Sequence, residues 1–89
     1  MNRNYVNNKL DVNKDIQYRK RFITSMIEGI ELEIHINERV IDTLREIQKN
    51  TWIQEAHLKM SELEEEIQVQ KRRVAYYAAQ AAWVQVDLE

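Results

Sequence analysis

Two histidines are the residues of this chain with the most obvious capacity for catalysis or metal binding. His35 lies four residues after Glu31 and three before Glu38, a spacing that puts all three side chains on one side of a helix. Metal sites in helical bundles use Glu-x-x-His pairs, and neither His35 nor His57 belongs to such a pair. We therefore interpret both histidines as surface residues beside ion-pair partners, and we expect neither a metal nor a cofactor.

A cluster of glutamates is the second candidate for chemistry, and its members are Glu62, Glu64, Glu65 and Glu66. General acid–base catalysis needs a pocket that shifts the pKa of a carboxyl group, and a polar stretch of helix offers none. The chain has no cysteine, no glycine-rich phosphate loop and no nucleophile motif. We interpret the glutamates as a solvated face and expect the protein not to be an enzyme.

Two short runs combine basic and aromatic side chains, which is typical of surfaces that grip phosphates and stack on bases. The basic members are Arg19, Lys20 and Arg21, between Tyr18 and Phe22, and Lys71, Arg72 and Arg73, shortly before Tyr76. The chain as a whole has a net charge of −2, and basic residues at the rim of a protein interface explain the runs equally well. Nucleic-acid binding through these six residues is therefore the alternative interpretation.

The element that positions these residues is a pair of heptad repeats. Apolar or small uncharged residues alternate in steps of three and four, which is the pattern of a coiled coil. The first seam comprises Ile23, Ile27, Ile30, Ile34, Asn37, Ile41, Leu44 and Gln48. The second seam comprises Ile53, Ala56, Met60, Leu63, Ile67, Gln70, Val74, Tyr77, Ala81, Val84 and Leu88.

The two seams differ in phase, which predicts a turn between them. Residue 55 would continue the first seam, but the second restarts at Ile53. Asn50 tolerates the left-handed conformation that ends helices, and Thr51 with Gln54 forms a capping box. The absence of proline and the single glycine favour helix throughout. We therefore predict an all-α fold, an antiparallel two-helix coiled-coil hairpin.

The predicted hairpin has a flexible arm over residues 1–12, a first helix over about 13–49, a hinge at 49–51 and a second helix over about 52–86. With this hinge, two residues of opposite helices lie at the same height along the hairpin when their numbers sum to about 101. Asn37 then faces Leu63, and Gln70 faces Ile30. The two polar seam residues are thus expected not to meet.

A second apolar stripe runs along each helix at positions nearly opposite the first seam, in the half of the hairpin nearest the termini. On the first helix its members are Tyr18, Phe22, Ser25, Gly29, Leu32 and Ile36, and on the second Val69, Arg72, Tyr76, Ala79, Trp83 and Val86. A helix that is apolar on two sides is normally buried on two sides. We predict a homodimeric four-helix bundle or a protein partner, bound through Tyr18, Phe22, Leu32, Ile36, Val69, Tyr76 and Trp83.

Charge is distributed unevenly along the predicted hairpin. The open half, residues 1–28 and 70–89, has nine basic and five acidic residues, a net of +4. The hinge half, residues 29–69, has four basic and ten acidic residues, a net of −6. Such a dipolar rod favours antiparallel association or an acidic partner at its open end.

These patterns together predict a small helical chaperone, adaptor or inhibitor that works by binding protein. No apolar run approaches the roughly 20 residues that a membrane span needs, and the first residues lead into no apolar core of a secretory signal. The lack of cysteine fits a reducing compartment. We expect a cytoplasmic protein without a membrane span.

Overall fold

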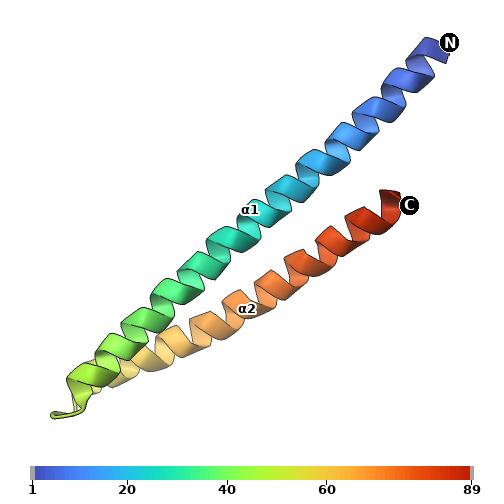
Figure 1. Cartoon of the computed structure of the whole chain (residues 1–89). Coiled ribbons are helices and arrows are strands. Elements are labelled where there is room, and N and C mark those ends of the chain that lie inside the picture. The colour runs from blue at the N-terminus through green and yellow to red at the C-terminus, as the bar shows by residue number, and fades with distance from the viewer. Residues whose placement is uncertain (1, 89) are drawn as a thin grey trace.

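The protein is a hairpin of two long helices, α1 (Asn2–Gln48) and α2 (Gln54–Leu88), joined by a short connection (Figure 1). The computed structural model describes the backbone of residues 2–88 and the side chains of residues 13–83. The rod measures 75 × 16 × 15 Å, and α1 extends beyond the end of α2 (Figure 1). The prediction of an all-α helical hairpin is confirmed.

The first helix begins much earlier than the pattern of apolar residues predicts. Residues 2–12, for which we predicted a flexible arm, have a helical backbone as part of α1. This segment contains neither proline nor glycine, so no residue in it breaks the helix. The side chains of this segment lie outside the described residues.

The connection, residues 49–53, is longer than the predicted hinge and uses different chemistry. The amide of His57 donates to the carbonyl of Ile53 at 3.0 Å, which makes Ile53 the N-cap of α2. The predicted capping box of Thr51 and Gln54 is therefore wrong. Asn50 also does not adopt a positive φ, so α1 does not end in the left-handed conformation that we predicted. Instead the amide of Lys49 closes a last tight turn onto the carbonyl of Glu46 at 3.3 Å.

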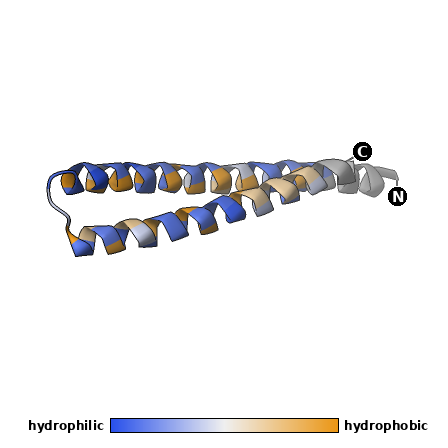
Figure 2. Cartoon of the chain, turned by 90° about the horizontal axis from the view of Figure 1, so that it is seen from below, coloured by the Kyte–Doolittle hydropathy of each residue, from blue (hydrophilic) through white to orange (hydrophobic). Residues whose placement is uncertain are grey.

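Both heptad seams face each other and form the core. Figure 2 shows hydrophobic residues recurring turn after turn along each helix. The buried apolar residues are Ile30, Ile34, Ile41, Leu63 and Ile67, and half-buried Leu44, Met60, Val74 and Tyr77 pack against them. Among the described side chains, every predicted seam residue is buried or half-buried except Ile53, which lies in the connection. The seam prediction is thus confirmed from Ile23 to Ala81, apart from this residue.

The register of the two helices differs from the predicted one. Asn37 Nδ2 donates to Gln70 Oε1 at 3.3 Å, and Gln70 Nε2 donates to Glu33 Oε2 at 3.1 Å. The numbers of these pairs sum to 107 and 103, whereas we predicted about 101, so the expectation that Asn37 and Gln70 do not meet is wrong. Two causes together explain why these sums of residue numbers exceed 101. The connection extends to Ile53, so α2 begins later than predicted. Helical side chains also lean toward their own N-terminus, which raises the sum of the residue numbers of two contacting residues in an antiparallel pair by about two.

Candidate interaction surface

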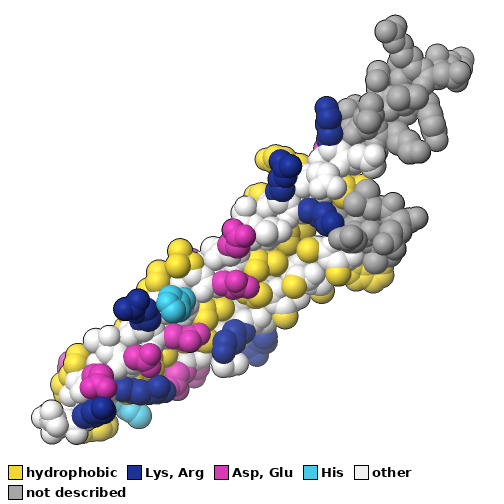
Figure 3. Space-filling view, viewed as in Figure 1, with side chains coloured by type: hydrophobic (Ala, Val, Ile, Leu, Met, Phe, Trp, Pro, Cys, Tyr) yellow, Lys and Arg dark blue, Asp and Glu magenta, His cyan; other side chains and the backbone are white. Residues whose placement is uncertain are grey.

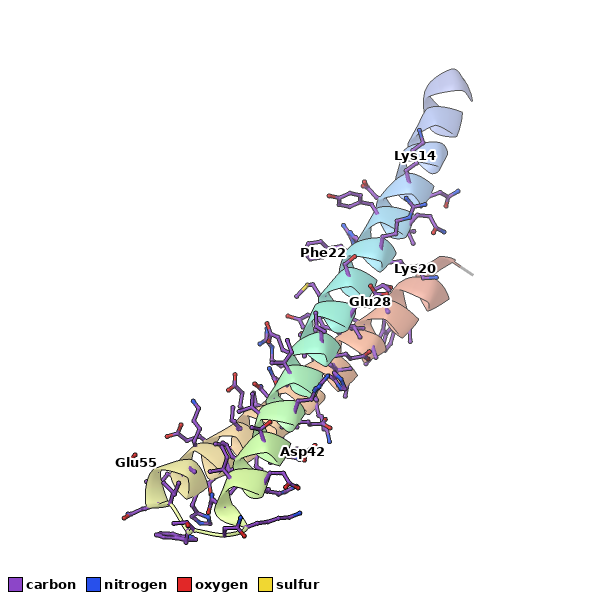
Figure 4. The ribbon with its side chains drawn as sticks, turned by 60° about the vertical axis from the view of Figure 1, so that its left-hand side comes forward. Lys14, Lys20, Phe22, Glu28, Asp42 and Glu55 are labelled. Carbon is purple, nitrogen blue, oxygen red and sulfur yellow. The ribbon has the colours of Figure 1, made fainter. Side chains whose placement is uncertain are left out.

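A groove between the helices at the open end brings together side chains from both. It has a volume of about 560 Å³ and is lined by Tyr18, Arg19, Phe22, Ile23, Gln80 and Trp83. Tyr18 is 73% exposed and Trp83 is 70% exposed, so large aromatic surfaces face outward at this point. Phe22 projects from the outer side of α1 at the edge of this groove (Figure 4). An exposed aromatic cluster of this kind marks a site of interaction more often than a lone surface aromatic does.

Apolar side chains continue along the same side of the hairpin beyond the groove. We call it the groove side, and its uncharged residues are Phe22, Met26, Gly29, Ile36, Val40, Thr43 and Ile47 on α1 and Val69, Tyr76, Gln80 and Trp83 on α2. A second hollow of about 380 Å³ is lined by Ile36, Arg39, Val40, Thr43 and Leu44. Met26 and Gln80 are half-buried, and the others are exposed. The groove side is therefore apolar along α1 and along the open half of α2, and it carries Glu33 and Glu66 beside Ile36 in a third hollow.

The opposite side of the hairpin is charged. There Arg45 Nη2 pairs with Glu64 Oε1 at 3.4 Å across the two helices. In an antiparallel pair of helices, each helix has one row of residues on either side of the seam, and each row contacts the equivalent row of the other helix. Glu31, Glu38 and Lys71 share the helical positions of Arg45 and Glu64, so they flank the seam on this charged side. Among the described residues, none of the large exposed apolar side chains of either helix lies at these positions.

The stripe on α1 is longer than the sequence analysis found. Heptad steps from Ile36 lead to Arg39, Thr43 and Glu46, which are mostly charged and predict that the stripe ends in the hinge half. A step of four leads instead to Val40, then to Thr43 and Ile47, and both Val40 and Ile47 are exposed. The average step from Tyr18 to Ile47 is close to the 3.6 residues of a straight helix, and this period would have predicted the whole stripe.

All seven predicted partner-binding residues are exposed on the hairpin. Tyr18, Phe22 and Trp83 meet at the groove, and Ile36, Val69 and Tyr76 lie farther along the groove side. Leu32 is exposed but lines neither of the hollows at Phe22 and Val40. The side chain of Val86 lies outside the described residues. Tyr76 also packs edge-on against Tyr77 of the core, with ring centroids 5.6 Å apart, which ties this exposed ring to the seam.

The described basic residues of the open half are largely exposed. Arg19, Arg21, Lys71, Arg72 and Arg73 are exposed, and among the described side chains none of them lies in a salt bridge. Lys20 is half-buried on the side of α1 that faces α2. The salt bridges in which both side chains are described all lie in the hinge half, where the acidic side chains gather (Figure 3).

The histidines and the glutamate cluster do not converge on a site. Within residues 13–83, no group of three or more His, Asp or Glu side chains is placed to hold a metal ion. The ring of His57 lies against that of Trp52 in the connection, with centroids 5.9 Å apart. Glu62 pairs with Lys59 at 3.8 Å in a solvent-exposed ion pair. Neither described helix has an apolar stretch long enough to cross a bilayer.

Comparison with protein-family models, curated proteins and solved structures gave no significant match to this chain.

Proposed function

We propose that the protein is a non-enzymatic interaction module, a small helical chaperone, adaptor or inhibitor that binds protein through the groove side. The observation that carries this proposal is the exposure of Tyr18, Phe22 and Trp83 around one groove built by both helices. Aromatic residues supply much of the binding energy in protein interfaces, because each buries a large area at a low entropic cost.

The asymmetry between the two sides of the hairpin supports the same proposal. A surface that serves only solubility carries mixed charges all round, as the side with Arg45 and Glu64 does. The groove side instead has apolar residues on two adjacent helices, and exposed apolar residues on that scale are costly to keep in water. Covering this side would complete a bundle with a second core, formed by a protein partner or by another copy of the chain.

The test is a double substitution of the two most exposed aromatic residues of α2, Tyr76→Lys with Trp83→Lys. It leaves the buried seam, the connection and the Asn37–Gln70 contact in place. We expect loss of self-association or of a captured partner, measured by solution mass and by affinity capture followed by mass spectrometry. The matched control is Gln68→Lys with Ala75→Lys, which adds the same two charges at exposed positions on the charged side of the same helix. Retention of solution mass and partner by the aromatic variant would refute the proposal.

Nucleic-acid binding through the basic residues remains the second candidate, because Arg19 lines the groove beside three aromatic side chains. The salt dependence of binding distinguishes the two proposals. Binding driven by phosphate contacts weakens steeply between about 50 and 200 mM salt, whereas apolar docking does not. Binding of single-stranded RNA that is lost in this range, and that is lost again in Arg19→Glu, would favour the nucleic-acid function.

A further inference from the structure

We infer that the groove side binds a second copy of this chain in an antiparallel arrangement, with the connection of each copy over the open end of the other. This inference rests on the proposed function, since it names the occupant of the proposed interaction surface. The two copies would form a four-helix bundle in which the groove sides make a second core.

Charge selects this orientation. The open half has a net charge of +4 and the hinge half a net charge of −6. A two-fold axis parallel to the helices would place like halves together, whereas an axis across the rod near its middle places each open half over a hinge half. On the groove side itself, Arg19 and Arg73 lie toward the open end, and Glu62 and Glu66 lie toward the connection, where Lys59 pairs with Glu62. The antiparallel arrangement therefore pairs opposite charges at the rim.

The length of the exposed apolar stripe on α1 supports the same arrangement. The aromatic groove lies at the open end, and on α1 the exposed apolar residues continue through Val40 to Ile47 near the connection. In an antiparallel dimer centred near Glu33, the stretch around Ile47 of one copy lies over Phe22 of the other. Each aromatic cluster then meets an apolar surface. A parallel dimer would instead place the two open ends, with their unpaired arginines, against each other.

Small residues allow a close approach at the middle of this surface. A Cβ added to Gly29 would meet no atom within 4 Å, so the backbone of α1 is openly accessible there. Glu33 and Glu66 oppose the arrangement, because they line one hollow beside Ile36, where the axis would bring the glutamates of the two copies close together. The carboxylate of Glu33 already accepts a hydrogen bond from Gln70 Nε2, which stabilises its charge.

A spin label at Asn50→Cys tests orientation directly, because the chain has no native cysteine and Asn50 is exposed in the connection, away from the groove side. The antiparallel dimer places the two labels roughly 50–55 Å apart, from the rise of about 1.5 Å per residue. A parallel bundle places them within about 20 Å, across one bundle diagonal. Measurement of the solution mass of the same labelled protein establishes whether a dimer forms.

A dimeric mass with the longer distance supports the inference. A short distance between labels overturns the orientation, and a monomeric mass at concentrations of about 100 µM overturns the dimer, since specific dimers are commonly tighter than this. The proposed function would be refuted by a different result from the one that refutes the dimer. A monomer that still captures a protein partner, and loses it on Tyr76→Lys with Trp83→Lys, would contradict the dimer while leaving the interaction module intact.

Discussion

Asn37 and Gln70 meet across the core of the hairpin, with Nδ2 of Asn37 donating to Oε1 of Gln70 at 3.3 Å. Gln70 is only 4% exposed, and its own amide nitrogen donates to Glu33. This chain of polar groups is satisfied inside a seam whose other polar member is Gln48, so it fixes which residues of the two helices lie side by side. Polar seam residues have this role in many coiled coils, at some cost in stability.

The Asn37–Gln70 contact should show strong coupling in a double-mutant cycle. Asn37→Leu alone removes the donor to the Oε1 atom of buried Gln70, and we expect a loss of about 1–3 kcal/mol in the free energy of unfolding. Asn37→Leu with Gln70→Leu should recover most of that loss, since it replaces both polar groups with apolar ones. Urea unfolding at one protein concentration measures both values. Simple additivity of the two single substitutions would show that the contact contributes nothing.

Removal of a core side chain should cost far more than removal of an exposed one of the same kind. Ile41 is 4% exposed, and Ile41→Ala should lower the free energy of unfolding by about 2–5 kcal/mol, through lost burial and the cavity left behind. Leu58 is 53% exposed on α2, and Leu58→Ala is the matched control, expected within about 0.5 kcal/mol of the parent. Equal losses for both variants would contradict the assignment of the core.

Gly29 is the only glycine of the chain and lies in the interior of α1. Because a Cβ there meets no atom within 4 Å, Gly29→Ala should stabilise the helix by about 0.5–1 kcal/mol, measured by thermal unfolding. Gly29→Trp adds a large side chain to the groove side and should weaken the proposed dimer without unfolding the hairpin. Unchanged dimerisation of the tryptophan variant would place the interface elsewhere.

Glu33 should resist the antiparallel dimer, since the two-fold axis brings its two copies together. Glu33→Gln keeps an oxygen that accepts the hydrogen bond of Gln70 and removes the charge. We expect this variant to dimerise several-fold more tightly in sedimentation equilibrium, and the gain should shrink as salt rises. Glu38→Gln, on the charged side, is the control and should leave the dissociation constant unchanged.

Sequence reasoning found the seam and the hairpin because a heptad repeat determines both, and burial of Ile30, Ile34, Ile41, Leu63 and Ile67 follows it. The sequence did not predict the register correctly. Which residues of the two helices make contact depends on where the connection ends and on how helical side chains lean toward the N-terminus. The extension of the apolar stripe to Val40 and Ile47 was not predicted for another reason. The outward face of a helix follows the helix's own period of 3.6 residues, whereas heptad steps follow the face that packs on the partner helix.

The central claim is that the groove side is covered when the protein functions, and Trp83 reports on this most directly. The chain has two tryptophans, so Trp52→Phe leaves Trp83 as the sole tryptophan fluorophore. Trp83 is 70% exposed on the single hairpin, so acrylamide should quench it freely at high dilution. At concentrations that favour association, or with a captured partner, we predict quenching several-fold weaker and a blue-shifted emission. Full quenching of Trp83 at every concentration and with every partner bound would contradict the account.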